Sequence, residues 1–179
     1  MALAIPEGDN RERHVCANCG AIHYENPNVV TGAIPLYEGD EAPKVLLCKR
    51  AIEPRHGYWT LPAGFLENGE TMEAGARRET LEESCAQLSD LVLYRLYDVI
   101  HARQIHVFYR ARMPRAEFQV TSESSEVRLF GFDEIPWEQL AFPTVYQALA
   151  DFVDEWPDGN FEVGGCEIDM EHWRSMKAR

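Results

Sequence analysis

Residues 64–86 constrain the fold of this chain most, because their glutamates repeat with the period of a helix. Glu79, Glu82 and Glu83 stand at positions i, i+3 and i+4, so a helix would place them on one face. Like charges at this spacing destabilise an isolated helix by roughly 0.2–0.5 kcal/mol per pair. A cation would remove that repulsion, and a ligand set of oxygens alone suits Mg²⁺, Mn²⁺ or Ca²⁺. A solvated acidic helix face is the alternative interpretation.

The residues before these glutamates predict where the helix begins. Residues 59–65 form an apolar, strand-like run, and Asn68-Gly69 marks a loop after it. Thr71 is placed to cap the helix, and Glu73 in the first turn suits the helix dipole. The predicted order is therefore strand, loop and helix, with backbone carbonyls of the loop beside the acidic cluster.

Gly64, Glu70 and the run from Arg78 to Glu83 carry a resemblance to a known family. Five residues separate Gly64 from Glu70, and seven more precede Arg78-Glu79-Thr80-Leu81-Glu82-Glu83. In residue types and spacing this closely resembles the signature of the Nudix hydrolases. The resemblance covers about residues 28–155 and implies an α/β fold, a three-layer α/β/α sandwich with a mixed sheet. The order of the predicted elements leads to the same fold class.

Three uncharged positions depart from the family pattern. Thr80 stands where the family prefers a bulky aliphatic residue, Gly75 lies inside the helix, and Cys85 replaces the usual terminal glycine. Gly75 should destabilise the helix by roughly 0.5–1 kcal/mol relative to Ala unless something packs closely over it. Cys85 leaves open how the helix ends, because residues other than glycine disfavour a left-handed cap.

The resemblance implies metal ligands and a salt bridge. Glu79, Glu82 and Glu83 would bind Mg²⁺ or Mn²⁺, with the carbonyl of Ala63 or Gly64 as a further ligand. We expect Arg78 to pair with Glu70 and tie the loop to the helix, rather than to bind substrate. An arginine beside a bound metal would otherwise compete with it for the carboxylates.

We expect the general base to come from the polar loop at residues 121–128, which precedes a strand. Related enzymes supply an extra carboxylate from this place, and Glu123 and Glu126 are the candidates. We predict Glu126, because it stands against the start of the strand. Two solvated loop glutamates are the alternative, and Glu82 or Glu83 remain candidates for the same catalytic role.

The family reaction is hydrolysis of a nucleoside diphosphate linked to another group, by in-line attack of water on phosphorus. The stretch at residues 135–142 and the ribbon-like N-terminus are similar to pyrophosphatases of ADP-ribose and FAD, which release AMP. The Ser-Gln-Pro-Trp-Pro-Phe element of NADH pyrophosphatases is absent. The alternatives are a module that binds ADP-ribose without cleaving it, and a hydrolase of NADH or nucleoside triphosphates.

Candidate substrate-binding residues flank the signature. Arg50 and Arg55 are placed to meet phosphates, although an ordinary surface role is the default for arginine. Burial in the core is the more common role of an aromatic ring. Four aromatic residues are nevertheless candidates for stacking on a base: Tyr24, Tyr58, Phe65 and Phe142.

The N-terminal segment contains one CxxC pair, Cys16 and Cys19, with the spacing of a zinc knuckle. It is similar to the second half of the zinc ribbon that precedes some Nudix domains, and the first pair of that pattern would lie before Met1. His14 or His23 would be needed to complete a Zn²⁺ site. The alternatives are a metal-free folded arm and a zinc-dependent contact for a protein partner.

Composition limits the remaining possibilities. A length of 179 residues, with 45% hydrophobic residues, predicts one domain with a small appendage. We divide it into a partial ribbon-like arm (1–28), a Nudix domain (29–156) and a tail (157–179). The net charge of −13 argues against a broad nucleic-acid surface, and no apolar run is long enough for a membrane. Five cysteines and no signal peptide predict a cytoplasmic protein, which resemblance suggests is a homodimer acting on a small nucleotide-sugar or dinucleotide.

The other segments predict a sheet with a second helix. Paired strands are expected at 29–37 and 44–50, across a turn at 38–43, and again at 91–100 and 104–113. A further strand is expected at 127–132, a short helix opening at 133–137, and a helix at 142–155.

Overall fold

The computed structural model describes residues 1–39, 42–171 and 173. Its main body is an eight-stranded sheet in the order β10-β5-β4-β9-β8-β11, with β6 paired to β5 and β7 to β4. The strands of this sheet are β4 (Asn28–Tyr37), β5 (Lys44–Arg50), β6 (Trp59–Thr60), β7 (Ala63–Phe65), β8 (Ser89–Val99), β9 (Gln104–Arg112), β10 (Ser124–Gly131) and β11 (Gly164–Glu167).

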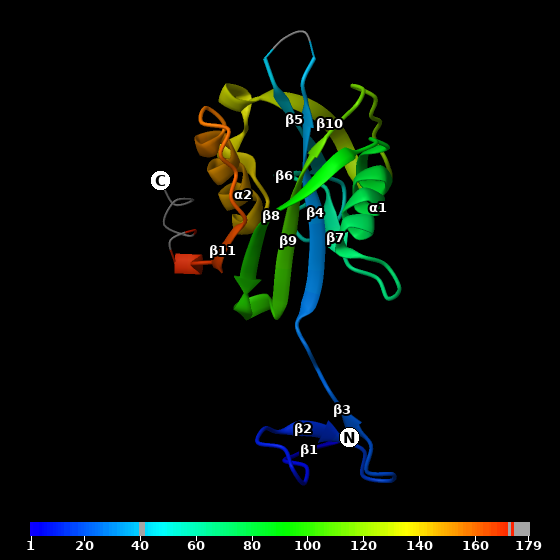
Figure 1. The fold of residues 1–179 in the computed structure, drawn as a ribbon. Coiled ribbons are helices and arrows are strands. Elements are labelled where there is room, and N and C mark those ends of the chain that lie inside the picture. Colours follow the sequence, from blue (N-terminus) through cyan, green and yellow to red (C-terminus); the bar gives the residue numbers. More distant parts are fainter. Residues whose placement is uncertain (40–41, 172, 174–179) are drawn as a thin grey trace.

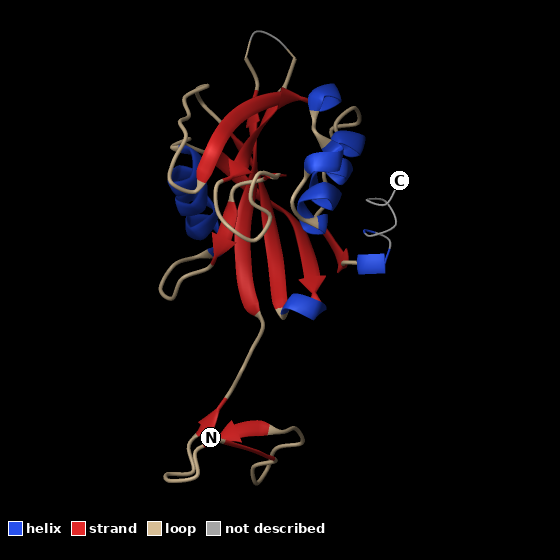
Figure 2. Ribbon diagram, turned by 180° about the vertical axis from the view of Figure 1, so that it is seen from behind, coloured by secondary structure: helices blue, strands red, loops and turns tan. Residues whose placement is uncertain are grey.

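The helices lie on opposite faces of this sheet (Figure 1). The helix α1 (Met72–Ser84) covers one face and α2 (Pro143–Glu155) the other, as the view from behind also shows (Figure 2). Three short 3₁₀ helices complete the body: η1 (Ile100–Ala102), η2 (Phe132–Glu134) and η3 (Trp137–Gln139). The predicted three-layer sandwich is confirmed.

The sheet is mixed, and its central pair runs parallel. β4 pairs with β9 from Asn28 opposite Gln104 to Leu36 opposite Arg112, while β8 runs antiparallel to β9. Alternate residues of β9 point to opposite faces. Phe108 therefore packs in the large core under α2, while Val107 and Tyr109 pack in a smaller cluster with Ala76 of α1.

Most predicted elements occur within three residues of their expected bounds. The second helix begins at Pro143 rather than residue 142, because proline at the first helical position lacks only an N–H that would have no helical partner. The turn expected at 38–43 includes residues 40 and 41, which lie outside the described residues. None of the described helices is long and apolar enough to span a membrane.

The segment after residue 157 contains a strand that the sequence did not predict. β11 pairs in parallel with β8, from Gly164 opposite Arg95 to Glu167 opposite Asp98. The buried Arg95 guanidinium donates to Asp151 Oδ2 at 2.8 Å, to Glu155, and to the backbone oxygen of Glu162 at 2.7 Å. Arg95 thus ties the sheet to α2 and to the chain entering β11.

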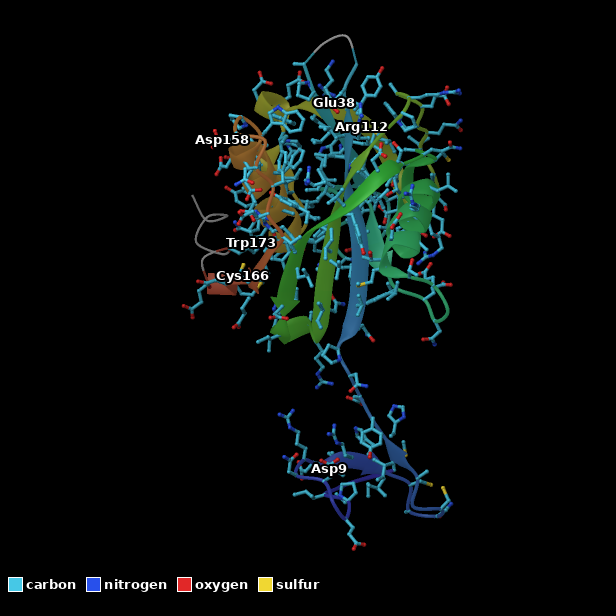
Figure 3. The ribbon with its side chains drawn as sticks, viewed as in Figure 1. Asp9, Glu38, Arg112, Asp158, Cys166 and Trp173 are labelled. Atoms are coloured by element: carbon cyan, nitrogen blue, oxygen red, sulfur yellow. The ribbon has the colours of Figure 1, made fainter. Side chains whose placement is uncertain are left out.

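The N-terminal residues form a separate three-stranded sheet of β1 (Ala2–Ala4), β2 (Arg13–Val15) and β3 (Ile22–His23). An extended segment joins this arm to β4, and the arm lies beyond the end of the main sheet (Figure 1). In Figure 3, Asp9 lies in the arm, and Glu38 and Arg112 lie at the opposite end of the molecule. Glu25, in the segment between arm and body, accepts from Arg103 at 3.0 Å.

Candidate active site

Local capping places α1 and its glutamates. Thr71 accepts a hydrogen bond from the Ala74 N–H at 3.1 Å, so the predicted cap is present. Cys85 has φ 58°, and its N–H donates to the Leu81 carbonyl at 2.8 Å. A cysteine therefore occupies the left-handed cap that glycine usually takes, which settles how the helix ends.

Gly75 allows α1 to lie close to β4, and Thr80 of the same helix is buried without an unpaired hydroxyl. A Cβ atom on Gly75 would lie 2.6 Å from Thr31 Cγ2, so close packing over this glycine explains its place in a helix. Thr31 Oγ1 also donates to the Met72 carbonyl at 2.7 Å. Thr80 is fully buried, and its hydroxyl donates to the Ala76 carbonyl at 2.8 Å, which satisfies a polar group at an aliphatic position.

Two of the three signature glutamates are buried. Glu79 and Glu83 are turned inward, with Glu83 6% exposed, whereas Glu82 lies at the exposed edge of the same face. Burial raises the pKa of the Glu83 carboxyl to about 8; the negative charge of Glu79 adds to this effect and Arg50 opposes it. Burial also raises the pKa of Glu79. Such carboxylates favour a nearby cation.

Gly64 brings the backbone of β7 against the helix. A Cβ atom at this position would overlap the carboxylate of Glu79, so a glycine is needed for the contact. The neighbouring Ala63 N–H donates to the carboxylate of Glu83. The strand β7 is thereby fixed beside both buried carboxylates.

Arg78 links the loop to the helix. Its Nη2 donates to Glu70 Oε1 at 2.8 Å and to the Phe65 carbonyl at 3.0 Å, as the sequence predicted for the Glu70 pair. Its Nη1 donates in addition to Glu79 Oε1 at 2.7 Å and Glu82 Oε2 at 3.0 Å. The competition expected between this arginine and a metal is therefore built into the site.

The donor set fits a hard divalent cation but is not gathered around one point. Within residues 1–39, 42–171 and 173, no three acidic, histidine or cysteine side chains lie close enough together to hold a metal. Glu79 and Glu82 instead both accept from Arg78 Nη1, at 2.7 Å and 3.0 Å. Together with the buried Glu83, these carboxylates form an oxygen-only donor set of the kind that Mg²⁺ and Mn²⁺ prefer. A metal bound to both Glu79 and Glu82 would take the place of the Arg78 Nη1 that they share in this structure.

The loop before β10 approaches the acidic cluster through Glu123 rather than Glu126. The charge of Glu123 contributes to the raised pKa of both Glu79 and Glu83. Glu126, which the sequence favoured as base, lies 3.5 Å from Lys49 Nζ. The register of β10 against β5 shifts between Ser124 and Glu126, and such a bulge redirects side chains in a way that residue order does not reveal.

A cavity of about 360 Å³ opens beside the loop of the signature. It lies on the α2 side of the sheet, and the Arg50 guanidinium stacks 5.1 Å from the centre of the Phe142 ring at its wall. Its lining is formed by Val30, Arg50, Pro54, Thr60, Ala63, Gly64, Phe65, Val99, His101, Ala102, Gln104, His106, Phe142, Pro143 and Thr144. A larger cavity of about 730 Å³, between the arm and the main sheet, contains none of the predicted active-site residues.

The cavity includes some of the predicted substrate-binding residues. Arg50 and Phe65 line it, whereas Arg55 and Tyr58 stack on each other 5.7 Å apart and are not among its described lining residues. A core location was wrong for three rings: Tyr24 is 56% exposed, Phe65 54% and Tyr58 37%. Sequence reasoning missed the polar lining residues on β9 and α2, because no motif joins these distant segments.

The CxxC pair forms a tight turn between β2 and β3. Hydrogen bonds from the backbone of Cys19 and Asn18 lower the pKa of the Cys16 thiol. His14 lies opposite His23 across the two strands, with its Nε2 3.7 Å from Glu25. Neither histidine joins the two cysteines in a metal-binding group among the described residues.

Comparison with known proteins decides the family. The model described as "NUDIX domain" matches residues 26–154. The chain belongs to the Nudix hydrolase family. A second model of this family, the zinc-ribbon model described as "Nudix N-terminal", matches residues 1–25. A Nudix hydrolase from Nitrosomonas europaea is 46% identical, with a TM-score of 0.84 over 93% of each chain.

The more distant relatives have varied activities. The NAD-capped RNA hydrolase NudC of Vibrio cholerae is 27% identical over 147 residues, 78% of this chain and 52% of that protein. The Edwardsiella ictaluri NudC is 36% identical over 77 residues, 43% of this chain and 28% of that protein. This Nudix chain spans about a quarter to a half of these curated relatives. An ADP-ribose pyrophosphatase of Streptococcus suis shares the fold, with a TM-score of 0.62 at 20% identity over 78% of this chain and 99% of that one.

Proposed function

We propose that this Nudix chain is a divalent-metal-dependent hydrolase that cleaves the pyrophosphate bond of ADP-ribose or FAD and releases AMP. The observation that carries the proposal is the contact between Gly64 and the buried Glu79, with Glu83 beside it. This arrangement places two carboxylates with raised pKa values against the backbone of β7, where the Ala63 N–H donates to Glu83. The apolar cavity next to it supplies room for the organic part of a nucleotide.

Each part of the reaction has a residue suited to it. When bound, Mg²⁺ or Mn²⁺ would be held by Glu79, Glu82, Glu83 and a carbonyl of Ala63 or Gly64, and would neutralise phosphate charge and activate water. Glu123 would accept the proton of the attacking water, in place of the Glu126 favoured by the sequence. This choice rests on the influence of Glu123 on both buried carboxylates.

Arg50 is the proposed phosphate ligand. It lines the cavity, and its charge acts on Glu83, so it lies between the acidic cluster and the organic part of the substrate. Its Nε is occupied by the Pro54 carbonyl at 2.7 Å, and the stacking on Phe142 fixes the plane of the guanidinium. A fixed arginine of this kind binds an anion with little loss of side-chain entropy.

A dinucleotide of the NAD type is the second candidate substrate. It is favoured by the relatives named NAD-capped RNA hydrolase, and opposed by the missing Ser-Gln-Pro-Trp-Pro-Phe element. The net charge of −13 makes long RNA an unfavourable partner unless a local surface binds it. Free NAD and an NAD-capped oligonucleotide therefore belong in the same assay.

A substrate panel with a point variant tests the proposal. The purified chain would be incubated with Mg²⁺ or Mn²⁺ and ADP-ribose, FAD, NADH, NAD, NAD-capped oligonucleotide or nucleoside triphosphates, and its products separated. We expect AMP from ADP-ribose or FAD, and a fall in kcat of at least about 10²-fold in Glu83→Gln, which removes one metal-ligand charge and keeps the shape. Release of AMP at an undiminished rate by Glu83→Gln would refute the metal site. Binding of ADP-ribose without any product would favour the non-catalytic module.

We also propose that the chain forms a homodimer and that Cys16 and Cys19 bind Zn²⁺. The arm supports both proposals, because it exposes apolar residues such as Leu3 and Ile5 and holds its cysteines in a knuckle turn. Light scattering coupled to size exclusion measures the mass, and metal analysis counts zinc per chain. A monomeric mass, or zinc near zero with Cys16 and Cys19 reduced, would each reject the corresponding proposal.

A further inference from the structure

Three polar side chains form a row in the cavity beside the signature loop. His106 Nδ1 lies 3.0 Å from Thr144 Oγ1, and His106 Nε2 lies 2.9 Å from Gln104 Oε1. Gln104 and His106 are two residues apart on β9 and share a face, while Thr144 comes from the start of α2. Two elements distant in the sequence thus meet in one hydrogen-bonded row.

The hydrogen-bond directions in this row are fixed by chemistry. Burial, with the nearby charge of His101 adding to it, lowers the pKa of His106 to about 4, so its ring is neutral and has one donor nitrogen. The Gln104 carbonyl oxygen only accepts, so the His106 Nε2 must donate to it. His106 Nδ1 is then the acceptor, and the buried Thr144 hydroxyl donates to it.

This row determines what Gln104 presents to the cavity. Its oxygen is directed at His106, so the amide nitrogen is held in the remaining position with its N–H groups as donors. Gln104 lines both this cavity and the larger one between the arm and the main sheet. Within the part of the chain that the structure describes, no protein oxygen is seen to accept from this nitrogen, which is not among the fully buried side-chain atoms that lack a partner. Water can therefore reach this nitrogen, and a ligand that accepts a hydrogen bond can take the place of that water.

The apolar and aromatic residues of the cavity lining favour a ligand with a flat apolar group. Val30, Phe65, Val99 and Phe142 line the cavity, and the Arg50 guanidinium is stacked on the Phe142 ring at its wall. A heterocyclic base combines an apolar face with hydrogen-bond acceptors on its edge, whereas a sugar phosphate lacks the flat apolar face. Both substrates proposed above share an AMP half that carries adenine.

We propose that Gln104 is a specificity-determining residue, whose amide N–H donates to an acceptor on the edge of the adenine ring. Thr144 and His106 are positioning residues that hold this amide in its orientation. The proposal rests on the function proposed above, because it assigns the AMP half of the substrate to this cavity. It predicts that bases are distinguished by the acceptor that they present to Gln104.

Equilibrium binding separates this role from catalysis. The dissociation constants of AMP and adenosine would be measured by calorimetry for the wild type, Gln104→Met, and the exposed matched control Gln139→Met. We expect about tenfold weaker binding of both ligands in Gln104→Met, the size of one lost hydrogen bond, and no change in the control. Equal affinities of Gln104→Met and wild type would overturn the proposal.

Analogues of adenosine identify the acceptor. The 1-deaza, 3-deaza and 7-deaza compounds each replace one ring nitrogen by carbon. We expect one of them to bind the wild type about tenfold more weakly than adenosine, and to bind Gln104→Met as well as adenosine does. If none of the three shows this dependence on Gln104, the amide does not read the ring and the assignment is wrong.

The hydrogen-bonded row of Thr144, His106 and Gln104 can be tested by a measurement that does not depend on turnover. Nitrogen NMR shifts of His106 should show a neutral ring protonated at Nε2 in the wild type, and Thr144→Val should alter this tautomer balance and weaken AMP binding. A ring protonated at Nδ1 in the wild type would refute the row. If AMP binds through Gln104 but no panel substrate is hydrolysed, the role of Gln104 stands and the proposed hydrolase activity is rejected. If substrate is hydrolysed and Gln104→Met leaves KM unchanged, the hydrolase activity stands and the role of Gln104 is rejected.

Discussion

Gly64 and Glu79 contact each other so closely that a methyl group on Gly64 would overlap the Glu79 carboxylate. The strand β7 and the helix α1 can keep this relation only while residue 64 has no side chain. Either β7 or the Glu79 side chain must move in Gly64→Ala, and the ligand geometry would change with it.

We expect Gly64→Ala to lower kcat/KM by about 10²-fold, because misplacement of reacting groups by about 1 Å has effects of that size. Steady-state kinetics and the Mg²⁺ concentration for half-maximal rate measure the effect. Gly164→Ala is the matched control, since a Cβ atom there would meet Arg95 at an ordinary 3.5 Å. Equal rates in the two variants would show that the contact has no catalytic importance.

Glu123 and Glu126 provide a matched pair for the general base. Glu123→Gln should reduce kcat by about 10²–10⁴-fold with little change in KM, as expected when a proton acceptor is removed. Glu126→Gln should stay within about threefold of the wild type, because its carboxylate faces Lys49 at 3.5 Å. The opposite ranking would return the catalytic role to Glu126.

Arg95 should matter for stability rather than for rate. Arg95→Met leaves the carboxylates of Asp151 and Glu155 without their cation in partly buried positions, so we expect a loss of about 2–4 kcal/mol in the free energy of unfolding. Urea denaturation measures this loss. The exposed Arg115→Met, which removes a surface pair with Glu117, should change it by less than about 0.5 kcal/mol. Similar losses in both variants would contradict the importance of the buried network.

His106 predicts how stability depends on pH. Its pKa falls from 6.5 in the unfolded chain to about 4 in the folded protein, chiefly through burial. Between these values the unfolded chain binds more protons, so the free energy of unfolding decreases as pH is lowered from 6.5 to 4. The expected loss from this residue is about 1.2 kcal/mol at pH 5.5 relative to pH 7.

The measurement is a series of urea denaturation curves between pH 4 and pH 8. His106→Gln should lack this part of the pH dependence, and His56→Gln, an exposed matched control, should keep it. An identical slope in the wild type and His106→Gln would mean that His106 is protonated equally in both states.

The sequence predicted those parts of the molecule that local patterns determine. The spacing of Glu79, Glu82 and Glu83 and the cap at Thr71 located α1, and alternating apolar runs located the central strands. β11 was missed because its four residues, Gly-Gly-Cys-Glu, have little strand propensity, and pairing with β8 alone makes them a strand.

Contacts of the site between residues close in the sequence could be predicted, and contacts between residues distant in the sequence could not. The pair of Arg78 with Glu70 was implied by the resemblance to the family signature, but the contact of Arg78 with Glu82 depends on side-chain rotamers. The approach of Glu123 depends on a bulge in β10, and the row from Thr144 to Gln104 joins α2 to β9. Such arrangements are set by tertiary packing, which a single sequence does not display.

The parallel pairing of β11 with β8 has a consequence for biosynthesis. All the other strands of the main sheet precede β11 in the chain, so β8 presents an unpaired edge until residues 164–167 leave the ribosome. Open strand edges recruit other chains, and nascent proteins are vulnerable at that stage. A ribosome stalled shortly before residue 164 would therefore hold a nearly folded domain whose β8 edge is available to chaperones or to neighbouring nascent copies.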